Sequence, residues 1–149
     1  MSLADELVYV ARGAHVDVAL TGKIARKLEK LGAEQRATMR AHFDAYADDG
    51  GSGGFPDTQY KFESREETGG TPSWKVAIYC FKAWQARIYG AEVTLNAKRI
   101  WIGTEIDPAK KRNAADMDNL RRAAKNLRPF IEEQHRTKEA DLPQKGRTP

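Results

Sequence analysis

The chain has 149 residues, of which 40% are hydrophobic and 31% are charged, and its formal net charge is +4. This length suits one domain with a substantial hydrophobic core. The sequence contains no run of about 20 apolar residues, as a membrane-spanning helix requires, and no secretory signal pattern. Its one cysteine, Cys80, lies in an apolar run, so we expect a buried free thiol and no internal disulfide. These features favour a cytoplasmic protein that does not interact with a membrane.

Charge is distributed unevenly along the chain. Residues 74–128 contain 12 Lys or Arg and 5 Asp or Glu, whereas residues 1–73 contain 9 and 12, and residues 129–149 contain 4 of each. This polarity indicates that one face of the protein binds a polyanion. The alternative is a solvated basic helix whose charge is balanced in space by the acidic half of the chain.

Two segments in the first half of the chain lack a strong regular pattern. Residues 1–20 are expected to be partly ordered, with apolar stretches at 7–10 and 16–20 that suit short strands. Residues 50–73 are rich in glycine, and we expect disorder in the glycine run. Within this segment, residues 59–63 are the one candidate for an edge strand.

Two helices are predicted between these segments. The first covers residues 21–31, with Thr21 as a candidate N-cap and Gly32 as its stop. The second covers residues 33–46, where Met, Phe and Tyr recur at helical spacing. The turn between them is short, which predicts an antiparallel helix hairpin.

Three antiparallel strands are predicted next, at residues 75–81, 85–93 and 98–104. The turns are expected at 82–83 and at 94–97, where Asn96 favours a tight turn. Alternation of side chains predicts one apolar face that packs on the helix hairpin. We assign to that face Val76, Ile78, Cys80, Ala86, Ile88, Ile100 and Ile102. We assign to the opposite, cationic and aromatic face Lys75, Tyr79, Arg87, Tyr89, Arg99, Trp101 and Glu105.

A basic loop and a basic helix follow the last strand. The loop is residues 109–112, and the helix is expected to begin at Asn113 as its N-cap. Its inner stripe is expected to be Met117, Leu120, Ala124 and Leu127. Pro129 should end or kink this helix. The residues beyond it, 129–149, are expected to form a polar C-terminal tail.

The chemistry that these residues favour is RNA cleavage by internal attack. The three histidines are far apart and no metal-ligand, phosphate-loop or nucleophile-elbow motif occurs. In RNA cleavage, negative charge develops on the phosphoryl oxygens, and fixed Arg and Lys side chains stabilise it. Aromatic side chains can stack on unpaired bases, and Tyr, Lys or Glu would have to transfer protons. A non-catalytic face that binds RNA or protein fits the same residues.

Four short motifs follow one another in an order typical of one protein family. They are a Leu-Glu-Lys-Leu helix end at 28–31, a Trp-Lys-Val-Ala-Ile-Tyr strand at 74–79, an aromatic-x-x-Arg-Ile-Tyr strand at 84–89, and Lys-Lys-Arg at 110–112. Over residues 21–127 the chain thereby resembles the RelE/ParE superfamily of bacterial toxins. The similarity is strongest to its HigB-like, phage Gp49-like branch.

This resemblance implies a fold, an activity and partners. The fold is α+β: an N-terminal helix hairpin packed on a small twisted antiparallel sheet, with a basic C-terminal helix, in one RelE-like domain over residues 21–128. The activity is that of a type II toxin, a ribosome-dependent endoribonuclease that needs no metal or cofactor. The partners are messenger RNA on the ribosome and a cognate antitoxin of the helix-turn-helix class.

The resemblance also assigns candidate site residues. Arg87 matches the strand arginine that contacts the scissile phosphate, and Lys75 matches a basic residue that opens the first central strand. The basic run after the third strand, Lys110, Lys111 and Arg112, would supply further phosphate contacts. Tyr89 and Glu105 are candidates for proton transfer. The remaining candidates for contact with RNA, from the cationic aromatic face, are Arg99, Tyr79 and Trp101.

The chain departs from the family pattern at several points. Ala77 stands where the RNA-cleaving members carry a second lysine, and both the glycine-rich insertion and the tail are unusual. The alternative is therefore a non-catalytic member of the same fold, either a gyrase inhibitor or a phage-derived protein that binds nucleic acid or protein. That function would depend on the basic helix, through Arg121, Arg122, Lys125 and Arg128.

Overall fold

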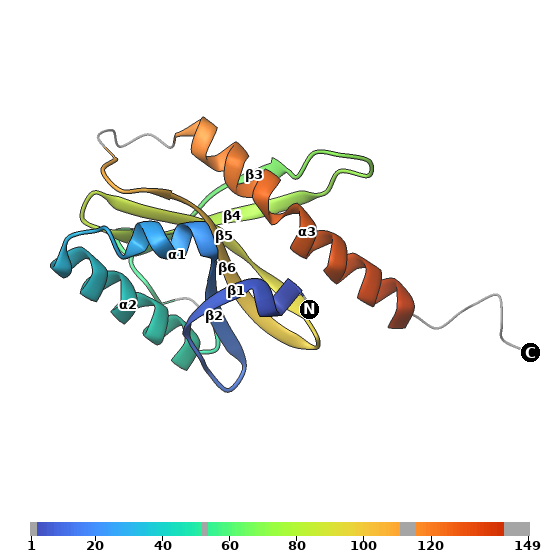
Figure 1. The fold of residues 1–149 in the computed structure, drawn as a ribbon, viewed down its shortest axis with the longest axis horizontal. Coiled ribbons are helices and arrows are strands. Elements are labelled where there is room, and N and C mark those ends of the chain that lie inside the picture. Colours follow the sequence, from blue (N-terminus) through green and yellow to red (C-terminus); the bar gives the residue numbers. More distant parts are fainter. Residues whose placement is uncertain (1–2, 52–53, 111–115, 142–149) are drawn as a thin grey trace, which may run out of the picture.

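The computed structural model describes residues 3–51, 54–110 and 116–141, and it has an α+β fold (Figure 1). A six-stranded sheet lies between helices. The strands are β1 (Leu7–Ala11), β2 (Val16–Thr21), β3 (Tyr60–Glu67), β4 (Lys75–Ala83), β5 (Ala86–Leu95) and β6 (Lys98–Asp107). The helices are a 3-10 turn (Leu3–Glu6), α1 (Gly22–Leu28), α2 (Ala33–Asp48) and α3 (Met117–Asp141).

The sheet is mixed and not purely antiparallel. Its strand order is β1-β2-β6-β5-β4-β3, in which β2 and β6 run parallel and every other neighbouring pair is antiparallel. The two strands expected in the N-terminal segment are confirmed, and they belong to the main sheet. The expected edge strand is also confirmed, because β3 forms one edge and pairs only with β4.

Helices cover both faces of the sheet, which the sequence did not predict. The helices α1 and α2 follow one another on one face, which we call the α2 face. The long helix α3 packs on the other, the α3 face. Strand residues that we expected to pack on α1 and α2 lie in the α3 core instead: Val76, Ile78, Cys80, Ile100 and Ile102. Only Ala86 and Ile88 of that set lie in the α2 core.

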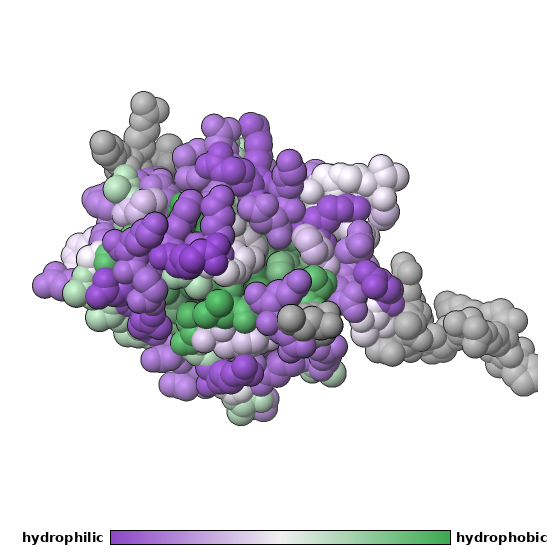
Figure 2. Space-filling model, in the orientation of Figure 1, coloured by the Kyte–Doolittle hydropathy of each residue, from purple (hydrophilic) through white to green (hydrophobic). Residues whose placement is uncertain are grey.

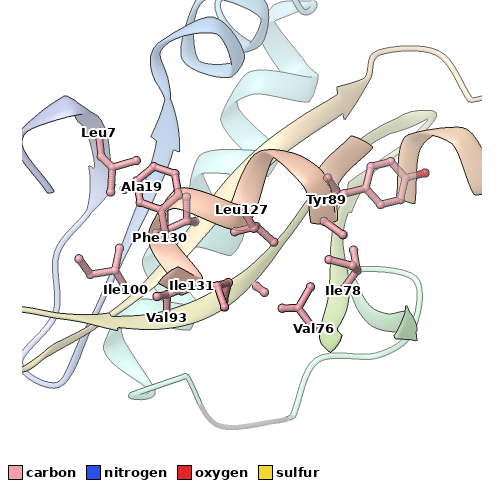
Figure 3. Close-up of a cluster of buried hydrophobic side chains, with 14 of the residues drawn as sticks. Leu7, Ala19, Val76, Ile78, Tyr89, Val93, Ile100, Leu127, Phe130 and Ile131 are labelled. Atoms are coloured by element: carbon pink, nitrogen blue, oxygen red, sulfur yellow. The ribbon is translucent and has the colours of Figure 1, made fainter. Parts of the chain in front are cut away.

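The α3 core consists of aliphatic strand residues and the inner stripe of the helix (Figure 3). Leu127, Phe130 and Ile131 of α3 lie over Val93 and Ile100 in this cluster. The Tyr89 ring lies at the edge of the cluster, and its hydroxyl points away from the other labelled side chains (Figure 3). Met117, expected on the inner stripe, is 44% exposed.

The α2 core is filled by aromatic rings. Phe81 of β4 contacts Phe43 of α2 and Trp101 of β6, with ring centroids 5.2 and 4.6 Å apart. The Trp101 indole Nε1 donates a hydrogen bond of 3.0 Å to the Tyr60 hydroxyl. Trp101 is fully buried, so the face that we expected to be open and cationic is the second core of the protein.

Two features of strand pairing explain why the predicted faces were wrong. Cys80 pairs with Tyr89 and Lys82 with Arg87, so Arg87 and Tyr89 lie on the face of Cys80 and not on that of Tyr79. The second feature is a β-bulge in β6. In the register of β5 with β6, Gly90 pairs with Gly103 and the preceding Tyr89 pairs with Glu105, which leaves Thr104 as an extra residue. One extra residue reverses the faces of all residues beyond it. Glu105 and Asp107 therefore lie on the face opposite to Trp101. At Gly90 the strands approach so closely that a Cβ atom would lie 2.1 Å from the Ile102 carbonyl oxygen.

The two hairpin turns differ in how well they were predicted. The β5–β6 turn contains Asn96 and Ala97, both with positive φ, inside the predicted segment. The β4–β5 turn was expected at 82–83 but is formed by Trp84 and Gln85, with Trp84 at φ 54°. Lys82 and Ala83 belong to β4.

The C-terminal helix begins later and ends later than expected. Asp116 Oδ1 accepts hydrogen bonds from the backbone N–H groups of Asp118 and Asn119, so Asp116 is the N-cap of α3. The expected cap, Asn113, lies outside the described residues. The helix continues through Pro129 to Asp141, because Phe130 and Ile131 pack into the α3 core.

No helix in the described part of the chain is long and apolar enough to cross a membrane.

Candidate functional site

Charged side chains form a row across the α3 face of the sheet, at the end where β4 turns into β5. Lys82 pairs with Arg87 in the β4–β5 register, and Arg87 pairs with Asp107 in the β5–β6 register. Paired residues point to the same face. Glu63 of β3 joins the row, since its carboxylate lies 3.9 Å from Lys82 Nζ. We call this the Arg87 cluster. Its members are Glu63, Lys82, Arg87, Tyr89, Asp107 and Lys110.

Arg87 is held in place by backbone carbonyl groups. Its Nη1 donates hydrogen bonds to the carbonyl oxygens of Trp84 and Ala86, both at the β4–β5 turn. Its Nε is buried and has no hydrogen-bond partner among the described residues. No carboxylate of those residues forms an ion pair with Arg87, so its charge is available to an anionic ligand.

Glu63 and Lys82 form a largely buried ion pair. Their side chains are only 8% and 15% exposed. Burial lowers the pKa of Lys82, and the positive charges of Arg87 and Lys61 lower it further, while Glu63 opposes this shift. A lysine with a lowered pKa beside a carboxylate is able to exchange protons nearer neutral pH than an exposed lysine.

Tyr89 and Cys80 pair with each other next to the row, two residues along β5 and β4 on the same face. Burial raises the pKa of the Tyr89 hydroxyl well above its usual value, and the nearby Cys80 and Glu63 add to this shift. Burial likewise raises the pKa of the Cys80 thiol to about 12. The Tyr89 hydroxyl has no hydrogen-bond partner within the described residues, although it is completely buried. A buried, neutral and unpartnered hydroxyl beside these charges retains an unused hydrogen-bond donor.

Lys110 and Asp107 complete the cluster from the end of β6. The Lys110 backbone N–H donates a 2.8 Å hydrogen bond to the Gln85 carbonyl oxygen, which holds this segment against the β4–β5 turn. Lys110 is only 8% exposed. Asp107 is engaged elsewhere: its Oδ1 accepts from the Ala109 N–H at 3.1 Å and its Oδ2 from Asn119 Nδ2 at 3.5 Å. The cluster thus has three cations and two carboxylates.

Only some of the predicted site residues come together in the structure. Arg87, Tyr89 and Lys110 come together in the Arg87 cluster. Glu105 pairs with Tyr89 in register, but its Oε2 lies 2.6 Å from Arg122 Nε, so it is held by α3. Lys111 and Arg112 lie outside the described residues.

The other four predicted residues lie on the α2 face, away from Arg87. Lys75 begins β4, seven residues before Lys82, and is therefore about 24 Å away along the strand. Tyr79 stacks on Tyr60, with ring centroids 5.3 Å apart. Arg99 pairs with Glu92 at 2.7 Å. Trp101 is in the core. The four side chains do not join Arg87 in one pocket.

Sequence reasoning missed Glu63 and Lys82. Lys82 was assigned to the turn, yet it continues the alternation of Val76, Ile78 and Cys80 by one more step. That alternation is the signal that would have placed it on the same face. Glu63 carries no comparable signal, because β3 pairs with β4 through a register shift at this residue.

The described residues contain no group of three or more His, Cys, Asp or Glu side chains arranged to hold a metal ion. The fold and the site define an α+β protein with a mixed sheet and a half-buried cationic cluster at one end of it. Comparison with family models, with curated proteins and with solved structures found no match.

Proposed function

We propose that this protein is a toxin-type endoribonuclease of the RelE-like class, which cleaves messenger RNA on the ribosome at the Arg87 cluster. One observation carries the proposal: Arg87, free of any carboxylate partner among the described residues, lies beside Lys82 and the unpartnered Tyr89 hydroxyl. The order of elements supports it too. The strands β1 and β2, the helices α1 and α2 and the edge strand β3 precede the antiparallel strands β4, β5 and β6, and α3 follows them.

Phosphate recognition in this site relies on the cations. The guanidinium of Arg87 offers its Nη2 group to a phosphate, because its Nη1 is bonded to backbone carbonyl groups and its Nε is buried. Lys82 and Lys110 add positive charge from the flanking strand and segment. Once the side chains that cover it move, the Tyr89 hydroxyl, which is buried in the free protein, donates to a phosphoryl oxygen and gains the partner that it lacks. These groups stabilise the charge that develops on the phosphoryl oxygens in the transition state.

Cleavage then follows from attack by the neighbouring ribose. The 2′-oxygen bonds to phosphorus and the bond from phosphorus to the 5′-oxygen breaks, which yields a 2′,3′-cyclic phosphate and a free 5′-hydroxyl. Glu63 accepts the proton from the 2′-hydroxyl, and Lys82, whose pKa is lowered, donates a proton to the departing 5′-oxygen. The cognate antitoxin of such a protein would act by covering this cluster or by excluding it from the ribosome.

The proposal is tested by replacing Arg87. Wild-type protein, Arg87→Met and Arg99→Met are each added to a translation reaction, and cleavage of the message is mapped by primer extension. Loss of one donor to the developing charge lowers cleavage by about 10²- to 10³-fold. Arg99→Met is the matched control, because Arg99 pairs with Glu92 on the opposite face, and it should cleave like the wild type. Intact message with the wild-type protein would refute the proposal.

A non-catalytic binder remains the second candidate, and the composition of the site favours it. The described part of the cluster contains no histidine, and Glu63, the expected proton acceptor, is 8% exposed. Glu63→Gln separates the two functions. It abolishes cleavage if the protein is a nuclease, but it preserves toxicity if toxicity results from binding alone. A gyrase supercoiling assay on the same variants identifies that binding target.

A further inference from the structure

A second polar site lies on the other side of the start of α3. The strand β6 continues beyond β2, since their last paired residues are Leu20 and Gly103. At this free edge of β6 a cleft of about 590 Å³ opens between α1 and α3. Its lining residues are mainly polar, and they include Lys23, Lys27, Thr104, Glu105, Asn119 and Arg122.

The cleft carries an excess of positive charge. Lys23 and Lys27 line it from α1, and Arg122 lines it from α3. Neither lysine forms an ion pair or a hydrogen bond through its side chain within the described residues. The two lysines are four residues apart on one helix, hence about 6 Å apart along its axis. Figure 2 shows hydrophilic side chains gathered in this view between α1 and the start of α3.

The one carboxylate in the cleft is already used. Glu105 Oε2 accepts from Arg122 Nε at 2.6 Å, and Glu105 Oε1 accepts from the Ile106 backbone N–H at 3.0 Å. A second Arg122 nitrogen, Nη2, donates to Asn119 Oδ1. These bonds fix the guanidinium in position and leave its Nη1 without a partner among the described residues. Arg122 therefore presents a fixed donor to the cleft while Glu105 is neutralised.

The cleft adjoins the Arg87 cluster. Asn119 lies between them, because it contacts Arg122 on one side and Asp107 on the other. Along β6, Glu105 of the cleft and Asp107 of the cluster are two residues apart, which is about 7 Å. The cleft and the cluster are thus neighbours at the end of the same strand.

We infer that the α1–α3 cleft binds the sugar–phosphate backbone of the RNA strand, next to the nucleotide held at the Arg87 cluster. The inference rests on the proposed function for the identity of the strand. A phosphate chain fits better than an acidic peptide, because the cleft adjoins the Arg87 cluster, whose proposed ligand is a phosphate, and because it offers no apolar anchor of the kind that dominates protein interfaces. The apolar side chains among the lining residues, Ile24 and Ile106, are themselves buried in the α2 core.

The test measures binding separately from cleavage. The probe is a short fluorescent single-stranded RNA with 2′-O-methyl riboses, which cannot undergo internal attack, and its affinity is followed by anisotropy at several salt concentrations. The variant is Lys23→Ala with Lys27→Ala. The control is Arg26→Ala with Lys30→Ala, which changes the charge equally on the same segment at exposed residues that do not line the cleft. Circular dichroism checks that both double variants are folded.

The cleft variant should lose two phosphate contacts. For single-stranded nucleic acid this makes the slope of log affinity against log salt shallower by about 1.4, while the control keeps the wild-type slope. Equal slopes for the two double variants would overturn the inference, as would a wild-type protein that does not bind the probe. If the wild-type protein does not cleave RNA but the cleft variant still shows a shallower salt dependence of binding than the control, only the nuclease proposal is refuted.

Discussion

The two faces of the sheet are covered by different kinds of side chain. On the α2 face, rings from β3, β4, β6 and α2 contact one another, and every buried ring nitrogen or hydroxyl described there has a partner. On the α3 face, aliphatic residues pack under the helix. The helix α3 begins only at Met117, and charged side chains lie on this face near the β4–β5 turn. The only two buried side-chain atoms without a partner in the described structure, Arg87 Nε and Tyr89 Oη, both lie there.

This difference shows where the protein tolerates unsatisfied polar groups. A buried donor without a partner costs stability, and native proteins retain few of them. Two unpartnered buried atoms in the Arg87 cluster, next to the buried ion pair of Glu63 with Lys82, are consistent with a site that a ligand completes. The α2 face, by contrast, contributes stability and has no comparable group among the described residues.

The largest expected effect tests the α2 core. Trp101→Ala removes a fully buried ring and the donor to Tyr60, so it should lower the free energy of unfolding by about 3–5 kcal/mol. Trp84→Ala is the matched control, because Trp84 is 58% exposed at the β4–β5 turn. It should change stability by less than about 1 kcal/mol. Denaturant unfolding measures both. Equal losses would show that Trp101 is not part of the core.

The next effect concerns the middle of α3. Arg128 donates to the carbonyl oxygens of Gly69 and Pro72 and lies over the Trp74 ring, 5.0 Å from its centroid. Arg128→Ala should therefore cost about 2 kcal/mol and expose residues 68–74 to proteolysis. Arg121→Ala, an exposed arginine of the same helix, is the control and should be nearly neutral. An Arg128 variant as resistant to protease as the wild type would contradict this anchoring role.

Two tyrosine hydroxyls should have effects of opposite sign. Tyr89→Phe removes an unpartnered buried hydroxyl, so it should raise the free energy of unfolding by about 1–2 kcal/mol while RNA cleavage falls. Tyr60→Phe removes the acceptor of the Trp101 N–H and should destabilise by a similar amount. Thermal and denaturant unfolding of the two variants give the comparison. Destabilisation by Tyr89→Phe would mean that its hydroxyl has a partner in the folded protein.

The smallest effect is a pH dependence. The pKa of the Cys80 thiol is raised from 9.0 to about 12 by burial, so the unfolded chain releases this proton first as the pH increases. The contribution to stability is fully present below pH 9 and is lost as the pH rises toward 12. At pH 10 the loss is about 1.4 kcal/mol. Cys80→Ala should remove the fall in the free energy of unfolding between pH 9 and pH 10. Above pH 10 the variant should still lose stability with rising pH, because burial also raises the pKa values of Tyr46 and Tyr60. Identical slopes below pH 10 would contradict a buried thiol.

Local sequence signals predicted most of the elements. Apolar alternation identified β4, β5 and β6, and Asn96 located one turn, because these signals act between residues close in the chain. Boundaries that depend on long-range packing were missed. Pro129 stayed inside α3 because Phe130 and Ile131 gain burial against distant strands. Trp84 formed a turn that its residue type does not favour, with φ at 54°.

The candidate site was predicted only in part, for the same reason. Arg87, Tyr89 and Lys110 were identified from residue type and resemblance. Their grouping with Glu63 and Lys82, and the loss of Lys75 and Arg99 from the site, depend on strand register. The β4–β5 register alone joins Arg87 to Lys82, whereas the extra residue Thr104 changes only the face of Glu105 and the residues after it, and no pattern in β6 alone marks that extra residue.

The sequence by itself determined an α+β chain with a basic second half, its strands and helices, and an arginine suited to phosphate. The tertiary structure decided which side chains meet. It buried Trp101, placed Lys75 and Arg87 on opposite faces and brought Glu63 to Lys82. The physical reason is that a strand's side chains alternate between faces. Which of them meet therefore depends on how the strands pair, on where a bulge interrupts the pairing, and on which helix covers each face.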